Sequence, residues 1–424
     1  MAQSVSLTEW IREHGLVLSS LDLDAPVEEL EPVLGMVGDA RVVAIGESSH
    51  HVREFFQLRH RLLRFLVERC GFTVYALEAP FTEGRALADW LHGGPGAVET
   101  VTAAGIALSL GDAPEVYEAL AWLRSHNQRR PDSPVRYAGA DVPGSLGSPL
   151  PALEEVSTYL RDIDSDALVP LGRARAVAEK FHQDLPFATM MAYSAVSEPD
   201  RETLTAALSE LLARMERLAS RQRSLGRAAR HVLATHHLRG AWYIDQLHRA
   251  QLTEGIEVAS TFRDLYMAET VLRLLAETPG SRIVLAAHNW HIQRAPAKHV
   301  SGADLFPAGY HLAAALGDDY RAIGVTAGHG HTAVSDVEAL AQGAFPFREA
   351  PLPPPEDDTL EAAFPLDRMC TIADLRAASV TVADAAAYRR MRMADYFLDQ
   401  PAFHAYDAVA LVSETHGSAR TRCQ

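Results

Sequence analysis

The chain has 424 residues, of which 48% are hydrophobic and 22% charged, and its formal net charge is −16. This composition fits a globular protein with one large domain and an insertion, or two domains, and the negative charge argues against a nucleic-acid or anionic-membrane partner. The three cysteines are far apart and form no CxxC pair, which fits a reducing compartment. The sequence also shows no signal-peptide pattern and no apolar run of about 20 residues, so we predict a cytoplasmic protein.

Four short apolar runs, rich in β-branched residues, each lead into an ionisable residue. Residues 41–46 precede Glu47, 72–77 precede Glu78, 135–140 precede Asp141, and 282–287 precede His288. Similar runs occur at 320–326 and 407–412. Such runs between helical segments are typical of buried parallel strands, so we predict an α/β fold with a central, mainly parallel sheet flanked by helices. Because ligands bind at the carboxyl ends of such strands, the four ionisable residues predict one site.

The first run ends in the sequence GESSH, residues 46–50, and the segment after it predicts a helix over about 52–69. Apolar residues recur there at helical spacing, and polar residues that include Arg61 are assigned to the opposite face. Arg59 falls inside the apolar arc instead. Because a buried guanidinium is costly without a carboxylate beside it, we predict an ion pair between Arg59 and Glu47 or Glu78.

The GESSH loop alone is weak evidence for a functional site, because Ser48 and Ser49 could simply cap the following helix. It gains weight from Glu78 and His288, which also follow predicted parallel strands, and His291 lies three residues after His288. Two imidazoles and two carboxylates could bind a divalent metal, or form a metal-free set in which a carboxylate orients a histidine that takes a proton from water. We expect the metal-free set and no cofactor, because no dense ligand cluster accompanies these residues.

Between residues 151 and 277 the pattern changes to stretches rich in Ala, Leu, Arg and Glu at helical spacing. We interpret 151–277 as a helical insertion, a bundle or lid, between two halves of the α/β core at 1–150 and 278–424. His236, His237 and His248 within it are interpreted as surface or lid residues. His329 and His331 either reach the site or lie in a glycine-flanked turn.

Two common kinds of active-site loop are missing from the sequence. It contains no GxSxG elbow, which disfavours a serine hydrolase of the α/β-hydrolase type. It also has no GxxxxGK[ST] loop and no GxGxxG that opens a helix after the first strand, which disfavours nucleotide-dependent chemistry.

The order and spacing of several blocks resemble the erythromycin esterase family from about residue 34 to residue 412. The blocks are 46–50, 53–59, 75–78, 139–141, 263–268, 287–291 and 309–312. The resemblance implies a central sheet with a helical insert and water-dependent opening of a macrolide lactone. It also implies His50 as the general base, with Glu47, Glu78, Arg59 and His288 as the surrounding polar set. The more distant TraB and Tiki-type proteins use a similar glutamate and histidine set as metallopeptidases.

The sequence departs from the family pattern directly after His50. His51 stands where the family usually has a small residue, most often glycine, and Val52 stands where it has Ser or Thr. We therefore expect weak or no activity on erythromycin-type lactones, and a different small-molecule ester or lactone from natural-product metabolism as the substrate. His51, Asp141, Arg263 and His291 are predicted to contact it. The alternatives are a metal-dependent hydrolase or peptidase, a biosynthetic acyl-transfer or cyclisation enzyme, and a non-catalytic binding protein.

Overall fold

The structure is a computed structural model that describes residues 5–106, 110–145, 147–298, 304–336, 338–339 and 347–419. Within these residues the main sheet has nine strands, eight of them in the order β1-β10-β13-β8-β2-β5-β3-β4, while β9 pairs with β8. In that order the strands are Leu16–Leu18, Cys370–Asp374, Ala408–Thr415, Tyr320–Ser335, Val42–Ile45, Ile283–Ala286, Val74–Pro80 and Arg136–Asp141, with β9 at Phe347–Pro351.

The six strands from β13 to β4 in that order run parallel to one another, β1 and β10 add an antiparallel edge, and β9 pairs antiparallel with β8. The predicted α/β class with a mainly parallel sheet is therefore confirmed, and the six predicted runs correspond to β2, β3, β4, β5, β8 and β13. β2, β3 and β5 are buried along their whole length, which explains their continuous apolar sequences. β8 continues to Ser335, so His329 and His331 are exposed residues of a strand and do not form a turn.

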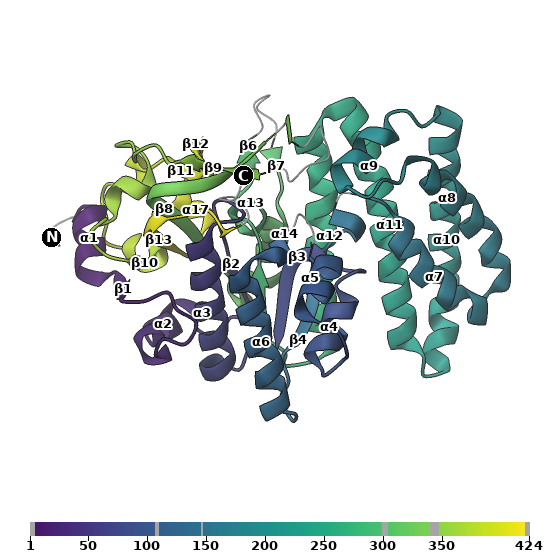
Figure 1. Ribbon diagram of the computed structural model, residues 1–424, viewed down its shortest axis with the longest axis horizontal. Coiled ribbons are helices and arrows are strands. Elements are labelled where there is room, and N and C mark those ends of the chain that lie inside the picture. The colour runs from purple at the N-terminus through teal and green to yellow at the C-terminus, as the bar shows by residue number, and fades with distance from the viewer. Residues whose placement is uncertain are drawn as a thin grey trace.

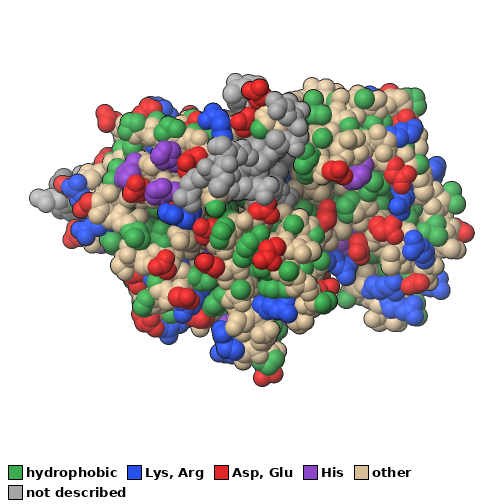
Figure 2. Space-filling view, viewed as in Figure 1, with side chains coloured by type: hydrophobic (Ala, Val, Ile, Leu, Met, Phe, Trp, Pro, Cys, Tyr) green, Lys and Arg blue, Asp and Glu red, His purple; other side chains and the backbone are tan. Residues whose placement is uncertain are grey.

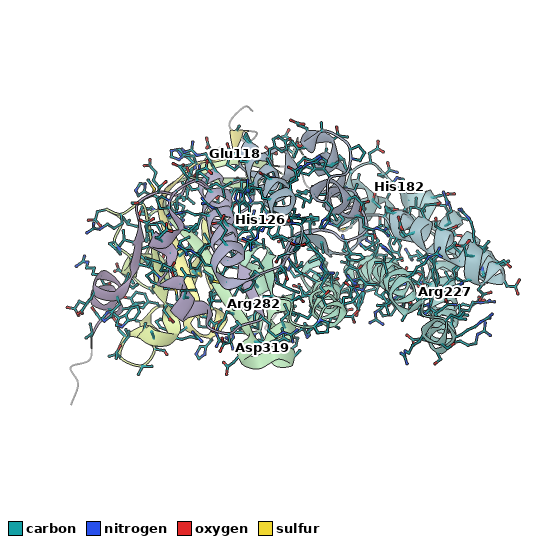
Figure 3. The ribbon with its side chains drawn as sticks, turned by 90° about the horizontal axis from the view of Figure 1, so that it is seen from below. Glu118, His126, His182, Arg227, Arg282 and Asp319 are labelled. Atoms are coloured by element: carbon teal, nitrogen blue, oxygen red, sulfur yellow. The ribbon has the colours of Figure 1, made fainter. Side chains whose placement is uncertain are left out.

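Helices cover both faces of the sheet (Figure 1). α3 (Arg53–Cys70) and α6 (Pro114–Arg129) pack on one face, and α12 (Ile256–Glu277) and α14 (Ala308–Leu316) pack on the other. At the amino ends of the strands, the guanidinium of Arg282 donates to the carbonyls of Gly38, Ala40 and Cys70. Figure 3, seen from below, shows Arg282 and Asp319 in the α/β part of the molecule and His182 and Arg227 in the helical part.

The helical part consists of α7 to α11, beside the sheet at the right of Figure 1. These helices are Leu150–Ile163, Leu168–Phe181, Pro186–Tyr193, Glu198–Ser224 and Ala228–Glu254, and they share a hydrophobic cluster of their own. α12 packs against α11 and leads back to β5. Acidic and basic side chains are interspersed over this face of the molecule (Figure 2). The helical stretch predicted between the third and fourth core strands is thus present, while its division at 150 and 277 into separate units stays a prediction.

The surface interpretation of His236, His237 and His248 is wrong. Only 4%, 1% and 1% of these residues are exposed, because α11 packs on the bundle on one side and toward the sheet on the other. Each ring has a hydrogen-bond partner. His236 contacts Thr270 Oγ1 at 2.8 Å, and His237 contacts Thr82 Oγ1 at 2.9 Å. His248 contacts the Gly147 carbonyl at 2.9 Å. Burial lowers the pKa of His237 to about 3 and that of His248 to about 4, so both are neutral at pH 7.

The assignment of Arg61 to the polar face of its helix is also wrong. Arg61 is completely buried, because the chain before α2 (Val33–Val37) covers that side of α3. Its Nη2 lies 2.5 Å from Glu29 Oε2, and its guanidinium donates to the carbonyls of Ser20 and Pro26. In the part of the chain that the structure describes, no helix is long and apolar enough to cross a membrane.

Candidate active site

The strand order places the four predicted strand ends next to one another. β2, β5, β3 and β4 are consecutive neighbours in the sheet. Glu47 therefore follows one strand, His288 follows the adjacent strand, and Glu78 and Asp141 lie near the ends of the next two. Because these strands are parallel, all four residues share one edge of the sheet, as predicted.

His50 and Glu47 form a hydrogen-bonded dyad at this edge. Nδ1 of His50 lies 2.7 Å from Oε1 of Glu47, and Nε2 lies 4.0 Å from Oε1 of Glu78. Because an ionised carboxylate only accepts hydrogen bonds, Nδ1 carries a proton and Nε2 of the neutral ring keeps a lone pair. The His50 side chain is 18% exposed, whereas Glu47 and Glu78 are 3% and 5% exposed. The dyad thus presents a base to solvent while both carboxylates stay buried.

Arg59 lies behind the dyad, as the helical pattern predicted. Its Nη1 atom is 3.1 Å from Oε2 of Glu47, and only 4% of its side chain is exposed. Burial alone would raise the pKa of Glu47, but Arg59 and the hydrogen bond with His50 outweigh burial and lower it. The predicted ion pair is confirmed with Glu47, and it keeps that carboxylate ionised.

The charges around His50 determine its protonation. Burial lowers the pKa of the imidazole, but the hydrogen bond to Glu47 and the charge of Glu78 raise it by more, so the pKa lies above its ordinary value. A base with a raised pKa binds a proton more firmly than a free imidazole does. Glu47 and Glu78 therefore stabilise the protonated form of the His50 imidazole.

His288 has a lowered pKa, in contrast to His50. It caps the short helix α13 (Asn289–Ile292), where its Nδ1 atom accepts a hydrogen bond of 3.2 Å from the Trp290 backbone N–H. Its own backbone N–H donates to Oε2 of Glu78 at 2.6 Å. Burial and the neighbouring His50 lower its pKa to about 4, and the two rings are 5.2 Å apart. His288 is therefore neutral at pH 7 and carries its proton on Nε2, which makes it a hydrogen-bond donor.

Arg263, from α12, connects the buried acids. It donates to both oxygens of Asp141 at 2.8 and 2.7 Å and to Oε1 of Glu78 at 2.7 Å, and its Nη1 is 3.0 Å from Nε2 of His291. Asp141 is completely buried, and Arg263 is largely buried as well. Burial alone would raise the pKa of Glu78, but His291 and Arg263 lower it well below its usual range. The contacts of Asp141 favour a role in holding Arg263 and Glu78 over direct contact with a substrate.

Asp264 completes this network, and the sequence analysis missed it. Its Oδ1 lies 2.7 Å from Nδ1 of His291 and accepts a 2.9 Å hydrogen bond from the backbone of Ala308. Burial and Arg263 lower the pKa of His291, while Asp264 and Glu78 raise it by more. The available signal was the pair of opposite charges at 263 and 264 in a helix whose neighbouring residues are largely apolar.

Asn289 is a second residue that the sequence analysis did not select. Its side-chain amide donates to the Val325 carbonyl at 2.8 Å and accepts from the Val325 N–H at 3.0 Å. A Cβ on Gly46 would lie 1.9 Å from the Asn289 oxygen, so only glycine fits at the start of the GESSH loop. Asn289 and Gly46 thus tie β2, α13 and β8 together beneath the dyad.

His51 lies in the left-handed region with φ of +57° and is 1% exposed. Its ring centroid lies 4.8 Å from that of Phe347, on β9, and Phe347 is 6.3 Å from the ring of His50. His51 and Phe347 therefore form an aromatic wall beside the base.

The described residues contain no group of three or more His, Cys, Asp or Glu side chains arranged to hold a metal ion. The groups most suited to such a role, Glu78, Asp141 and His291, all contact the guanidinium of Arg263. A cation at that point would have to displace another cation, so the donor set fits arginine better than a metal.

Comparison with known proteins relates the chain to one family. The family model described as erythromycin esterase matches residues 67–415. The chain is 30% identical over 361 residues to erythromycin esterase type II from Escherichia coli, covering 84% of this chain and 85% of that protein. It is 28% identical over 317 residues to erythromycin esterase type I from the same species, covering 70% and 72%.

Solved structures show the same fold. An erythromycin esterase mutant, EreC in its open conformation, matches with a TM-score of 0.80 at 22% identity and covers 96% of this chain and 99% of that one. A Bacillus cereus protein matches with a TM-score of 0.77 at 19% identity and covers 97% and 98%. Since the family model and the type II enzyme each match most of its length, this chain belongs to the erythromycin esterase family.

Proposed function

We propose that the protein hydrolyses a carboxylic ester or lactone with a water molecule that His50 activates. Membership of the family supports an esterase-like hydrolase. The observation that carries the finer proposal is the 2.7 Å hydrogen bond from His50 Nδ1 to Glu47, which leaves Nε2 as the base. A carboxylate that orients a histidine in this way is the arrangement that hydrolytic triads use.

In the proposed reaction, Nε2 of His50 takes a proton from water while the water oxygen attacks the carbonyl carbon. The tetrahedral intermediate collapses when the carbon–oxygen bond to the alcohol breaks, and the His50 imidazolium returns the proton to the departing alkoxide. The products are a carboxylic acid and an alcohol, joined in one molecule when the substrate is a lactone. Ser49 is a poor nucleophile in this setting, because its hydroxyl donates to the Ala333 carbonyl at 2.6 Å.

His288 supplies the donor for the oxyanion in this proposal. It is neutral at pH 7, with its proton on Nε2, and its ring lies beside that of His50. A well-placed donor of this kind contributes roughly 3–4 kcal/mol to the transition state. Arg59 is buried behind Glu47, so we assign it to stabilising that carboxylate and not the oxyanion.

Glu78 contributes negative charge beside the imidazoles. Arg263 and the His288 backbone hold its two oxygens, so Glu78 keeps one position when His50 gains a proton. A fixed anion there stabilises the imidazolium that forms in the first step. Arg263, Asp141, Asp264 and His291 are therefore proposed as the support that positions Glu78.

The proposed substrate is an ester or lactone of natural-product metabolism other than an erythromycin-type macrolide. The aromatic wall of His51 and Phe347 supports this choice, because His51 stands where the family usually has a small residue and its ring packs against Phe347 beside His50. A macrolide ring is bulky, and its fit depends strongly on the shape of this wall.

Incubation in ¹⁸O-labelled water with a panel of macrolides, smaller lactones and p-nitrophenyl esters tests the proposal. Mass spectrometry should find one ¹⁸O in the carboxylate of a smaller lactone or an ester, and little opening of 14-membered macrolides. Products without ¹⁸O, or products joined to an added alcohol, would favour acyl transfer or cyclisation over hydrolysis. Rapid opening of a 14-membered macrolide would contradict the proposed substrate class but not the proposed hydrolysis.

A further inference from the structure

Residues 416–418, directly after β13, pair with the chain directly after His50. The Ser418 N–H donates to the His51 carbonyl at 2.7 Å, and the Arg53 N–H donates to the His416 carbonyl at 3.0 Å. Val52 and Gly417 form the antiparallel bridge between these two hydrogen bonds. The backbone on the carboxyl side of the base is therefore held by a segment more than 360 residues away in the sequence.

Glu54 fastens this segment to α3. Its Oε2 accepts a 2.8 Å hydrogen bond from the His416 N–H, and its Oε1 lies 3.0 Å from His416 Nδ1. Oε1 also accepts from Arg53 Nη2 at 2.6 Å. Glu54 is 6% exposed and lies in the first turn of α3, where the helix dipole favours a negative charge.

The residue between the base and this pairing has an unfavourable backbone conformation. His51 has φ of +57°, in the left-handed region that residues with a Cβ seldom adopt. Such a conformation persists only when surrounding contacts impose it. At His51 those contacts include the hydrogen bond from Ser418 to its carbonyl and the packing of its ring on Phe347.

We infer that Glu54 is a positioning residue for His50, acting through a clamp formed by Glu54 and residues 416–418. The inference rests on the proposed role of His50 as the base. Without the clamp, residue 51 relaxes toward an ordinary backbone conformation and carries the adjacent imidazole away from its working position. A displacement of about 1 Å in a reacting group lowers a rate by roughly 100-fold.

The first experiment compares Glu54→Ala with Glu68→Ala, which removes an exposed carboxylate from the same helix. With p-nitrophenyl butyrate as substrate, Glu54→Ala should lower kcat about 10- to 100-fold with a small change in KM. Glu68→Ala should leave both unchanged. Loss of a merely structural contact would lower the melting temperature and leave kcat of the folded protein as it was, which would overturn the inference.

The second variant isolates the strain at residue 51. Glycine adopts φ of +57° without a steric penalty, so His51→Gly removes the strain that would drive residue 51 out of this conformation when the clamp is lost. Glu54→Ala should therefore lower kcat much less in the His51→Gly background than in the wild-type background. Equal losses in the two backgrounds would show that Glu54 does not act through residue 51.

Amide hydrogen exchange tests the clamp without an enzyme assay, so its outcome does not depend on the proposed function. Glu54→Ala should speed amide exchange in residues 47–54 at least 10-fold and leave α6 unchanged. If the wild-type protein fails to hydrolyse every ester tested while this exchange effect appears, the proposed function fails and the clamp stands. Unchanged exchange in residues 47–54 would overturn the clamp, whatever the enzyme assays show.

Discussion

Arg59 Nη1 lies 3.1 Å from Oε2 of Glu47, and the other oxygen of that carboxylate lies 2.7 Å from His50 Nδ1. One carboxylate thus connects a buried cation to a partly exposed base. This connection defines what the removal of each partner should do, because Arg59 keeps Glu47 ionised, and Glu47 orients His50 and raises its pKa.

Replacement of His50 by alanine should abolish most turnover and leave the fold intact. The side chain lies in a loop, outside the hydrophobic clusters, so little packing is lost. General acid–base groups contribute about 10²- to 10⁴-fold to a rate. The measurement is kcat on the best ester of the panel, together with a melting curve, and His182→Ala on the exposed end of α8 is the matched control. A folded variant that keeps wild-type kcat would remove His50 from the mechanism.

The pH dependence of kcat/KM should show an acid limb centred above pH 6.5. Glu47 and Glu78 raise the pKa of His50, and the base works only when it is deprotonated, so activity falls as pH falls through that raised pKa. Glu47→Gln removes one of the two charges and should move the limb to lower pH. A limb that does not move in Glu47→Gln would show that another group controls it.

Arg59→Ala should unfold more easily and also lose activity. Breaking a buried ion pair by removing one partner costs roughly 3–5 kcal/mol, because the remaining charge stays buried. Urea unfolding measures this cost, and Arg69→Ala provides the comparison. Arg69 pairs with Glu28 at an exposed position, where such a pair is worth about 1 kcal/mol or less. Equal effects of the two variants on the unfolding free energy would contradict a buried pair.

Ester hydrolysis should persist in the presence of a strong chelator. Arg263 already supplies positive charge to Glu78, Asp141 and His291, which leaves these groups engaged with a guanidinium. Elemental analysis of the purified protein accompanies the assay. Stoichiometric zinc or manganese, combined with chelator-sensitive activity, would favour the metal-dependent alternative.

The folded state should lose stability in mild acid because of the neutral histidines of α11. His237 and His248 have pKa values of about 3 and about 4 in the folded protein, against 6.5 for a free imidazole. The unfolded chain binds protons first as pH falls, so this stabilisation is complete above pH 6.5 and declines from there toward pH 4 for His248 and pH 3 for His237. Urea unfolding at a series of pH values measures the slope, which His237→Gln should reduce. An unchanged slope in that variant would exclude His237 as a contributor.

The sequence by itself determined the sheet class, the strand ends that carry the site, and the burial of Arg59. These features depend on local periodicity, since a strand buried on both faces is apolar throughout and a cation inside an apolar helical arc needs a carboxylate. The sheet order places these strands next to one another, and their parallel direction puts their carboxyl ends at one edge of the sheet.

Only the tertiary structure decided which other polar residues are buried and what they contact. Arg61, His237 and Asp264 lie on helix faces whose burial depends on which segment packs there, and no spacing within a helix reveals its neighbour. The same holds for the clamp, because residues 51–53 pair with residues 416–418, more than 360 positions away in the sequence. Local sequence patterns report which face of an element is apolar, whereas contacts between distant segments follow from the packing of the whole fold.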